Sequence, residues 1–417
     1  MFRFIHAADV HLDSPLWGLE KYDGAPVDEI RSATRRALER LVQLAIDEQV
    51  AFVLIAGDIY DGDWPDYNTG LFFNSQMTRL KEAGIRVFLI LGNHDAANTM
   101  TRSLTLPDNV VKFPHDAAVT EVLEDVGVAI HGQSFATKAV TEDLSQSYPP
   151  KVAGMLNIGM LHTNEGGREG HDNYAPCTVE GLKTHGYDYW ALGHVHTREE
   201  LSESPLVIYP GNIQGRHIRE TGPKGCYLCT VDGGTIVPEF RTLDVFRWEL
   251  ANVDLSDVES TDELADKVVD ELQACRERAD GRPLAVRVEL TGQTPIHDDL
   301  LGERERWTNE IRSYALDAGG GRMWVEKVRI RTLPVPQEMP AESAGDDPMG
   351  ELAEILNALR ENPAAFEKYG IDFRKLPDKL RGELRELLPV NDPEWCRSIL
   401  DEAESLLTHT LRGKAAK

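Results

Sequence analysis

Mainly apolar segments alternate with amphipathic ones through the first part of this 417-residue chain. Residues 2–8, 52–56 and 87–91 are rich in apolar residues, and a glycine or polar turn follows each of them, as is typical of buried strands. Residues 28–49 and 69–83 lie between these segments and repeat apolar positions at the period of an amphipathic helix. This order predicts a layered α/β sheet with helices packed against it.

The pattern becomes richer in strands after about residue 125. The predicted strands there are residues 126–131, 157–162, 189–192, 206–209, 225–231 and 236–240. Two layers of sheet with helices outside accommodate both halves of this region. We therefore predict a four-layer α/β/β/α sandwich over residues 1–242.

The remaining chain divides into three predicted parts. Residues 243–332 have a helix–strand–helix–strand order, at 264–278, 284–290, 299–316 and 324–330, which predicts a small α+β capping domain. Residues 333–348 contain four prolines and several small or acidic residues, so they are predicted to be a linker. Residues 349–417 form the helical C-terminal region, with amphipathic helices expected at 349–361, 376–388 and 393–411.

Composition is that of a globular protein, with 41% hydrophobic and 27% charged residues. The chain contains no run of about 18 apolar residues, so we expect no membrane-spanning helix. The N-terminus leads directly into a predicted strand without the pattern of a secretory leader. The five cysteines are an odd number and widely spread, which favours a reducing compartment and a cytoplasmic location.

A formal charge of −26 changes the expectations about partners. Acidic residues exceed basic ones in every part of the chain, so no basic tail is hidden in the total. A strongly negative protein repels nucleic acid at long range, and any DNA binding must therefore use local cationic patches, bound metals or a partner.

Acid, amide and imidazole side chains follow the predicted strands, at the point where each strand ends. In order along the chain they are Asp9, His11, Asp58, Asn93, His94, Asp95, His162, His194 and His196. In open α/β sheets the ligand crevice lies at the carboxyl ends of the strands, so these side chains are expected to converge there. A glycine precedes Asp58, Asn93 and His194, and it lets the backbone turn sharply at a strand end.

Mixed oxygen and imidazole donors suit a borderline divalent metal ion. Without His94 and Asp95 this set contains seven donors, which are too many for one open catalytic ion and suit two ions that share a bridging carboxylate. Metal pairs of this kind stabilise the attacking and leaving oxygens in a phosphoryl displacement. The sequence therefore predicts a dimetal centre for phosphoester chemistry.

The ordered set D-x-H, GD, GNHD, H and GHxH resembles the calcineurin-like metallophosphoesterase superfamily. Within it, the segment FIHAADVHLDSPL, the GDIYD run and the capping segment resemble the SbcD-type nuclease subunits of double-strand-break repair. The narrower likeness is to YhaO-like DNA repair exonucleases. It rests on HDNYAPC at 171–177, YDYWALGHVH at 187–196, YPGNIQGRH at 209–217, KGC at 224–226 and DPMGEL at 347–352. The resemblance covers residues 1–240 by motif and the rest of the chain by layout.

This resemblance implies a role for each residue at the predicted centre. It implies that one metal is held by Asp9, His11 and His196, the second by Asn93, His162 and His194, and that Asp58 bridges both. The resemblance implies that His94 is not a metal ligand but the catalytic histidine beside the scissile phosphate. It implies Asp95 as the residue that orients His94. Two divalent ions are expected, with manganese as the expected metal. Some related nucleases have a histidine three residues after the GD motif, where this chain has Asp61.

The predicted function is a dimetal-dependent DNA exonuclease, with endonuclease activity as an addition, that acts in DNA end processing and repair. The alternative is a metallophosphoesterase of nucleotides, phosphoproteins or other small phosphoesters. A scaffold that has lost its metals is a third interpretation, which the intact set of seven ligands disfavours. The expected partners are DNA, an SMC-like (SbcC-type) ATPase and a second copy of the chain, with no membrane.

Several features have two interpretations that the sequence leaves open. Arg216 and His217 are candidate substrate-binding residues of a cationic rim, or they form surface salt bridges with the abundant acids. The C-terminal helices are a docking module for the ATPase, or a packed accessory domain.

Two further features favour a structural interpretation. Cys226 and Cys229 are expected on opposite faces of a strand, which disfavours a zinc site. His6 lies inside the first predicted strand and is expected to be a hydrogen-bonded histidine of the core.

Overall fold

The computed structural model describes residues 1–14, 32–61, 67–97, 105–167, 174–335, 355–359 and 407. The chain divides into two compact units. The first comprises residues 1–250, 275–286 and 322–326, and the second comprises residues 251–274, 287–321 and the described residues from 327 onward. The domain limits that the sequence predicted, after residues 242, 332 and 348, stay predictions.

One six-stranded sheet has the order β12-β11-β1-β2-β3-β4. Its strands are β1 (Phe2–Ala7), β2 (Phe52–Ala56), β3 (Arg86–Ile90), β4 (Val110–Lys112), β11 (Gly225–Asp232) and β12 (Thr235–Thr242). β1, β2, β3 and β4 are parallel to one another, whereas β11 is antiparallel to both β1 and β12. The carboxyl ends of β1, β2 and β3 therefore meet at one end of this sheet.

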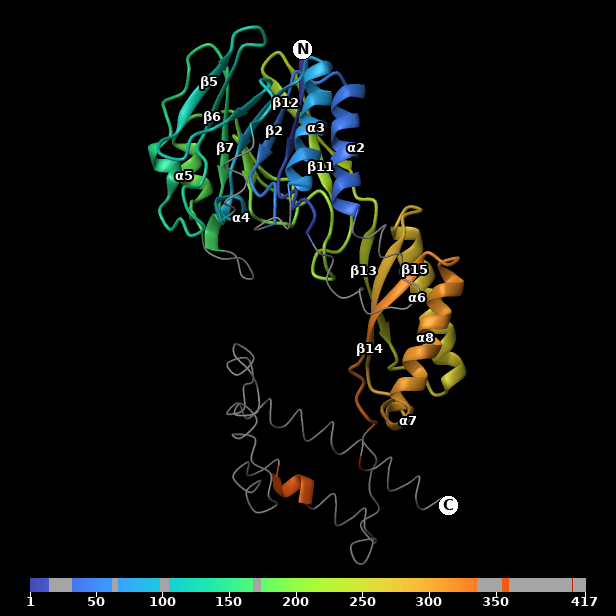
Figure 1. The fold of residues 1–417 in the computed structure, drawn as a ribbon. Helices are drawn as coiled ribbons and strands as arrows, with labels where there is room; N and C mark the ends of the chain where they lie inside the picture. The colour runs from blue at the N-terminus through green and yellow to red at the C-terminus, as the bar shows by residue number, and fades with distance from the viewer. Residues whose placement is uncertain are drawn as a thin grey trace, which may run out of the picture. The chain divides into compact units, whose positions relative to one another are not determined.

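A second six-stranded sheet has the order β5-β6-β7-β8-β10-β9. Its strands are β5 (Val119–Leu123), β6 (Val128–Gly132), β7 (Leu156–His162), β8 (Tyr189–Gly193), β9 (Glu199–Glu203) and β10 (Leu206–Tyr209). The four inner strands are parallel, and β5 and β9 pair antiparallel at the two sides. Figure 1 shows the two sheets as adjacent layers.

Aromatic side chains fill the space between the two sheets. Phe4 stacks on Phe52 with ring centroids 5.1 Å apart, and it meets the ring of Tyr189 from the opposite sheet edge to face at 5.5 Å. These residues belong to one buried cluster, together with Phe88 and the partly buried Phe2. The cluster arises because alternate residues of a strand point to the same face.

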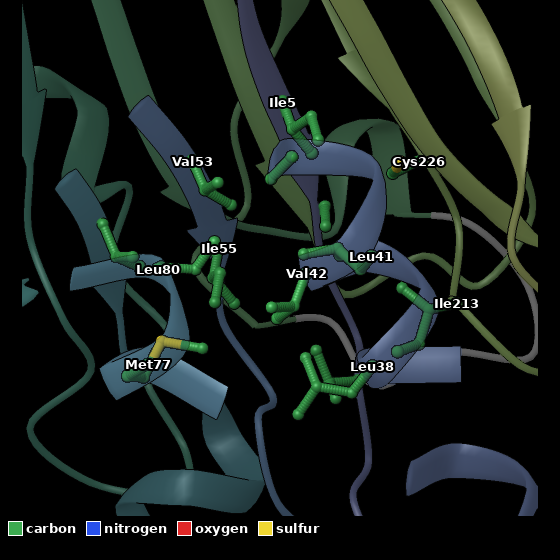
Figure 2. Packing of buried hydrophobic residues seen from close by; sticks show 14 of the residues in the cluster. Ile5, Leu38, Leu41, Val42, Val53, Ile55, Met77, Leu80, Ile213 and Cys226 are labelled. Carbon is green, nitrogen blue, oxygen red and sulfur yellow. The ribbon is translucent and has the colours of Figure 1, made fainter. Parts of the chain in front are cut away.

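Two helices cover the outer face of the first sheet. α2 (Ala33–Asp47) and α3 (Asn68–Glu82) lie side by side along it (Figure 1). Figure 2 shows side chains of both helices packed on side chains of the strands. The helix residues are Leu38, Leu41, Val42, Met77 and Leu80, and the strand residues are Ile5, Val53 and Ile55. Each fully buried leucine of this kind stabilises the fold by about 2 kcal/mol relative to an exposed one.

The outer face of the second sheet is covered by shorter elements. They are α5 (Val179–Lys183) and the 3-10 helices η2 (Leu144–Ser147) and η3 (Glu165–Gly167). Leu182 of α5 is buried in a cluster with Trp190 and Val207 of the sheet. Helical elements thus lie outside both sheets, and the predicted α/β/β/α sandwich is confirmed.

A three-stranded sheet of order β13-β14-β15 follows in the chain. Its region contains β13 (Arg247–Asp254), α6 (Thr261–Arg278), β14 (Leu284–Thr291), α7 (His297–Gly302), α8 (Arg304–Ala318) and β15 (Met323–Ile330). The α+β character agrees with the prediction, although β13 was missed and the helix predicted at 299–316 is divided in two at Glu303. Gly302 accounts for the division, because glycine weakens a helix by about 1 kcal/mol relative to alanine.

Much of the C-terminal prediction falls outside the described residues. Residues 355–359 are helical, and most of the predicted linker and of the other two helices lies outside the described residues. The same holds for residues 171–173 and for the segment 347–352. Among the described residues, no helix combines the length and apolar character that a membrane span requires.

Two structural interpretations from the sequence are confirmed. Cys226 packs in the cluster under α2 and α3, whereas Cys229 packs between the sheets, so β11 places them on opposite faces. His6 is fully buried, with Nδ1 2.9 Å from Tyr189 Oη and Nε2 3.1 Å from the carbonyl oxygen of Leu192.

Candidate metal centre

The chemistry-bearing residues lie where parallel strands of both sheets end. Asp9 and His11 follow β1, and Asp58 follows β2. Asn93 and His94 begin the short helix α4 (Asn93–Ala97) after β3. From the second sheet, His162 ends β7, while His194 and His196 follow β8. The ends of five strands therefore bring these residues together, as expected because ligand crevices of α/β sheets lie at the carboxyl ends of the strands.

The backbone at these positions is fixed and strained. The pairing of β1 with β2 continues past the strands, since the amides of Asp9 and His11 donate to the carbonyls of Gly57 and Asp58 at 3.0 Å. Asp9, His11, Asp58 and His194 have φ angles of 50°, 44°, 51° and 99°. Such a backbone costs about 1 kcal/mol or more per residue and is typical of functional sites. The strain directs these side chains into the centre.

Glycine is required at two positions because the ligand side chains lie against the backbone. A Cβ atom on Gly92 would lie 2.3 Å from Asp58 Oδ1 and 2.7 Å from His162 Nε2. A Cβ atom on Gly57, which has a φ of 94°, would lie 2.4 Å from His162 Nδ1. Both glycines therefore create the space in which Asp58 and His162 meet.

One group of potential ligand atoms comes from Asp9, His11 and His196, whose donor atoms all lie within 4.8 Å of one another. The Nε2 atoms of His11 and His196 are 3.1 Å apart. His196 Nδ1 lies 2.7 Å from Glu220 Oε1, and because a carboxylate only accepts, Nδ1 carries the proton in this pair. In the neutral ring the lone pair of His196 Nε2 is therefore directed toward His11.

A second group comes from Asp58, His162 and His194, again within 4.8 Å. The side-chain oxygen of Asn93 lies 3.0 Å from His162 Nε2 and 3.2 Å from His194 Nδ1. His162 Nδ1 donates to the carbonyl oxygen of Ala56 at 2.9 Å, so that His162 Nε2 has the lone pair in the neutral ring. This arrangement fixes the tautomer that a metal needs.

Asp58 belongs to the second group and also lies near His11 of the first. Its Oδ2 atom is 3.4 Å from His162 Nε2 and 3.9 Å from His11 Nε2. Carboxylate, amide and imidazole donors thus converge on two adjoining positions, and within the part of the chain that the structure describes the buried His11 Nδ1 has no hydrogen-bond partner. This donor set fits a pair of divalent ions with a bridging carboxylate.

The charges of the centre are strongly coupled. Burial raises the pKa of Asp9 and lowers the pKa of His11 to about 3. Burial also opposes the charges of Asp58 and His162, but their mutual attraction outweighs it. The pKa of Asp58 is therefore held below its usual range, and the pKa of His162 rises to about 9. Of these two histidines, His162 is the one whose protonated form is favoured, and its proton compensates the charge of Asp58.

His94 lies beside this centre with its side chain about one third exposed. Its backbone amide donates to Asp58 Oδ1 at 3.0 Å, and its Nδ1 atom lies 3.0 Å from Asp61 Oδ1. Burial lowers the pKa of His94, but the hydrogen bond to Asp61 and the charge of Asp58 outweigh it, and the net shift is upward. The hydrogen bond to Asp61 and the charge of Asp58 thus favour the protonated form of His94 beside the Asp58 carboxylate.

Asp95 has a different place from the predicted one. Its carboxylate accepts hydrogen bonds from the amides of Gly92, Ile59 and Tyr60, at 3.1, 3.1 and 2.9 Å. It therefore fixes the loop that carries Asp58, while the carboxylate against the His94 ring is Asp61. The GNHD motif placed Asp95 next to His94 in sequence, but α4 directs the Asp95 side chain inward, where it is buried.

Three residues near the centre have contacts that the sequence did not reveal. Glu220 is buried against His196, and Arg216 lies between Glu220 Oε1 at 3.2 Å and Asp61 Oδ2 at 3.5 Å. His217 Nε2 is 3.5 Å from Glu220 Oε1. Glu220 is 24 residues from His196, and no motif marked it. The acid-rich composition was the one indication that Arg216 pairs with carboxylates.

Two family models match the chain. The model described as calcineurin-like phosphoesterase matches residues 2–198, and the model described as metallophosphoesterase YhaO, middle domain, matches residues 248–333. The uncharacterized metallophosphoesterase YhaO of Bacillus subtilis (strain 168) is 38% identical over 296 residues, which cover 70% of this chain and 72% of that protein.

More distant relatives are named DNA double-strand break repair protein Mre11. The protein of Methanopyrus kandleri is 24% identical over 390 residues, covering 86% of this chain and 76% of that protein. The protein of Sulfolobus acidocaldarius is 23% identical over 329 residues, covering 72% and 77%.

These matches confirm the resemblance inferred from the sequence motifs, and they agree with the two large mixed sheets. Metallophosphoesterases are hydrolases that use a dimetal centre, and the donor groups found here fit that requirement. The chain belongs to the calcineurin-like metallophosphoesterase family.

Proposed function

We propose that this protein is a dimetal-dependent DNA exonuclease, with additional endonuclease activity, that hydrolyses phosphodiester bonds in DNA end processing and repair. The observation that carries the proposal is that Asp58 groups with His162 and His194 and also lies beside His11, while the backbone amide of His94 donates to the same carboxylate. The similarity to proteins named for double-strand break repair supports DNA as the substrate.

Each side chain has a proposed task. Asp9, His11 and His196 would hold one ion, Asn93, His162 and His194 would hold the second, and Asp58 would bind both. When bound, the divalent cations would supply Lewis-acid chemistry that offsets the phosphodiester charge and lowers the pKa of water, so that hydroxide is available as the nucleophile at neutral pH. Manganese is the proposed metal because the family resemblance implies it, whereas the imidazole and oxygen donors by themselves would also accept iron or zinc.

His94 is the proposed proton donor to the leaving 3′ oxygen. Asp61 Oδ1 holds the proton on His94 Nδ1, so that the other ring nitrogen, Nε2, is available to substrate. Proton transfer from Nε2 leaves a neutral imidazole that Asp61 keeps in the same orientation. General acid catalysis of this kind contributes about 10²–10⁴ in rate.

A second candidate is hydrolysis of small phosphoesters such as nucleotides or phosphoprotein side chains. The net charge of −26 and the pairing of Arg216 with two carboxylates favour it, since both reduce attraction for a polyanion. The dimetal centre would serve either substrate class.

An assay with end-labelled DNA and manganese, run beside bis-(4-nitrophenyl) phosphate, separates the two candidates. DNA shortening that requires Asp58 and His94 supports the nuclease. Ester hydrolysis without any loss of DNA, with or without an added SMC-like ATPase, would instead support the small-ester enzyme.

We further propose the partners and location expected from the sequence. An SMC-like ATPase would dock on the C-terminal helices, and a second copy of the chain would form a homodimer. A cytoplasmic location is supported by the buried thiols of Cys177, Cys226 and Cys229, because a reducing compartment keeps cysteines as thiols.

A further inference from the structure

A chain of charged side chains connects the ligand His196 to the proton donor His94. Along it, Glu220, Arg216 and Asp61 alternate in charge, and each contacts the next. Its two ends belong to different sheets, because His196 follows β8 and His94 follows β3. None of these three residues belongs to the predicted metal ligands.

Glu220 fixes the first end. Its Oε1 atom accepts from His196 Nδ1 at 2.7 Å, and its Oε2 atom accepts from the backbone amide of Arg216 at 2.7 Å and from Asn212 Nδ2 at 2.8 Å. Only 5% of Glu220 is exposed. Both carboxylate oxygens are therefore held, and the His196 ring cannot rotate without losing a buried, charge-assisted bond. Carboxylates that hold ligand histidines in this way strengthen metal binding.

Asp61 fixes the other end. Its Oδ1 atom lies 3.0 Å from His94 Nδ1, and its Oδ2 atom accepts from Ser14 Oγ at 2.5 Å. Ser14 belongs to the loop after β1, so Asp61 connects that loop to the beginning of α4. Asp61 also lies 3.7 Å from His11 Nδ1, which is longer than a hydrogen bond.

Arg216 joins the two carboxylates. Its side chain is 11% exposed, and its two terminal nitrogens face Glu220 and Asp61 separately. The guanidinium compensates both negative charges, and removing it would leave two carboxylates in a buried site without their cation. This use of both terminal nitrogens differs from the substrate-binding role considered from the sequence.

We propose that Glu220, Arg216 and Asp61 are positioning residues, in which Glu220 sets the metal-binding nitrogen of His196 and Asp61 sets the ring of His94. The proposal rests on the proposed dimetal function of the site. It assigns separate consequences to the two ends, metal affinity to Glu220 and turnover to Asp61, with Arg216 affecting both. A merely structural ion-pair network would change stability without this division.

The test uses the full chain and three variants. In Glu220→Gln, the Kd for Mn²⁺ measured by calorimetry should rise about 10-fold or more, and excess Mn²⁺ should restore kcat. In Asp61→Asn, the Kd for Mn²⁺ should stay within about threefold while kcat falls about 10-fold at unchanged KM. Arg216→Met should show both losses. Asp125→Asn, which breaks a surface pair with Arg86, is the matched control and should change neither quantity.

A double-variant cycle makes the Asp61 assignment decisive. Because Asp61 acts through His94, Asp61→Asn should cost little in a His94→Ala background. Multiplicative losses in that cycle, or an unchanged Mn²⁺ affinity in Glu220→Gln, would overturn the proposal. If Arg216→Met fails to fold by circular dichroism, Arg216→Lys replaces it, and smaller losses in both quantities are expected.

Failure of the proposed function would look different. Kinetics are measured on labelled DNA or, if the wild type does not cleave DNA, on a small phosphodiester with an alcohol leaving group such as a dinucleotide, because this leaving group needs a proton as DNA does. Metal affinity needs no substrate. Absence of DNA cleavage by the wild type would therefore contradict the nuclease assignment and leave the positioning test intact.

Discussion

The backbone amide of His94 donates a 3.0 Å hydrogen bond to Asp58 Oδ1, which ties the proposed proton donor to the proposed bridging ligand. The bond uses the main chain and not the ring. Replacement of the His94 side chain therefore keeps this bond, and with it the position of the carboxylate. His94 and the ligands can consequently be separated by mutation.

We expect His94→Gln to retain two metal ions and to lose activity by about 10²–10⁴ on DNA. The loss should be much smaller on bis-(4-nitrophenyl) phosphate, because nitrophenolate leaves without a proton. Calorimetry with Mn²⁺ and kcat on both substrates test this. Metal loss in the variant, or equal losses on the two substrates, would contradict the role of proton donor.

Asp58→Ala should remove the carboxylate that the two proposed ions share. Calorimetry should find at most one Mn²⁺ bound instead of two, and turnover should fall further than in His94→Gln, since the charge that couples the ions is gone. Asp125→Ala provides a control, because it removes an exposed carboxylate that pairs with Arg86. Full metal occupancy in Asp58→Ala would refute the bridging role.

Strands that consist of continuous apolar residues were predictable. β2 and β10 coincide with the predicted residues, since their segments are apolar and bounded by turns. β13 was missed because Arg247 is a charged strand residue that is almost completely buried. Arg247 Nε pairs with Asp244, three residues earlier, at 2.9 Å, and a hydrophobic pattern does not record such a neutralised charge. The polar strand β9 was missed because it lies at the side of its sheet, partly exposed.

The candidate site divides in the same way. The convergence of Asp9, Asp58 and His194 follows from strand ends, which the sequence locates well. The carboxylates that contact the histidines could not be predicted in this way. Glu220 and Asp61 lie in turns, and no periodic pattern in the sequence indicates where the side chains of a turn point. For Asp95 the sequence was misleading. Its position next to His94 suggested that it contacts the His94 ring, whereas its carboxylate accepts from the amides of Ile59 and Tyr60.

Gly92→Ala should damage the centre through size alone. The added Cβ would lie 2.3 Å from Asp58 Oδ1, so the carboxylate or the loop must move. We expect Mn²⁺ affinity to fall about 10-fold or more and turnover to fall with it. Gly181→Ala in α5 is the matched control, because its Cβ meets one hydroxyl at 3.2 Å and alanine favours a helix. Equal behaviour of the two variants would contradict the requirement for glycine.

A buried polar chain away from the metal site sets a pH dependence of stability. His6 Nε2 must donate to the carbonyl of Leu192, since that oxygen only accepts, and His6 Nδ1 then accepts from the Tyr189 hydroxyl. The neutral ring satisfies both contacts. Burial accordingly lowers the pKa of His6 from 6.5 to about 3.

Acid should therefore destabilise the fold through His6. Its pKa is depressed in the folded state, so the unfolded chain takes up the proton first, and stability is lost as the pH falls from 6.5 toward 3. The free energy of unfolding of the wild type, minus that of His6→Gln, should decrease by about 1.4 kcal/mol between pH 7.5 and 5.5. Urea denaturation followed by tryptophan fluorescence measures both proteins at each pH. Subtraction removes the other titrating groups, which the two proteins share. A difference that stays constant, or grows on acidification, would show that His6 is not held neutral between the two sheets.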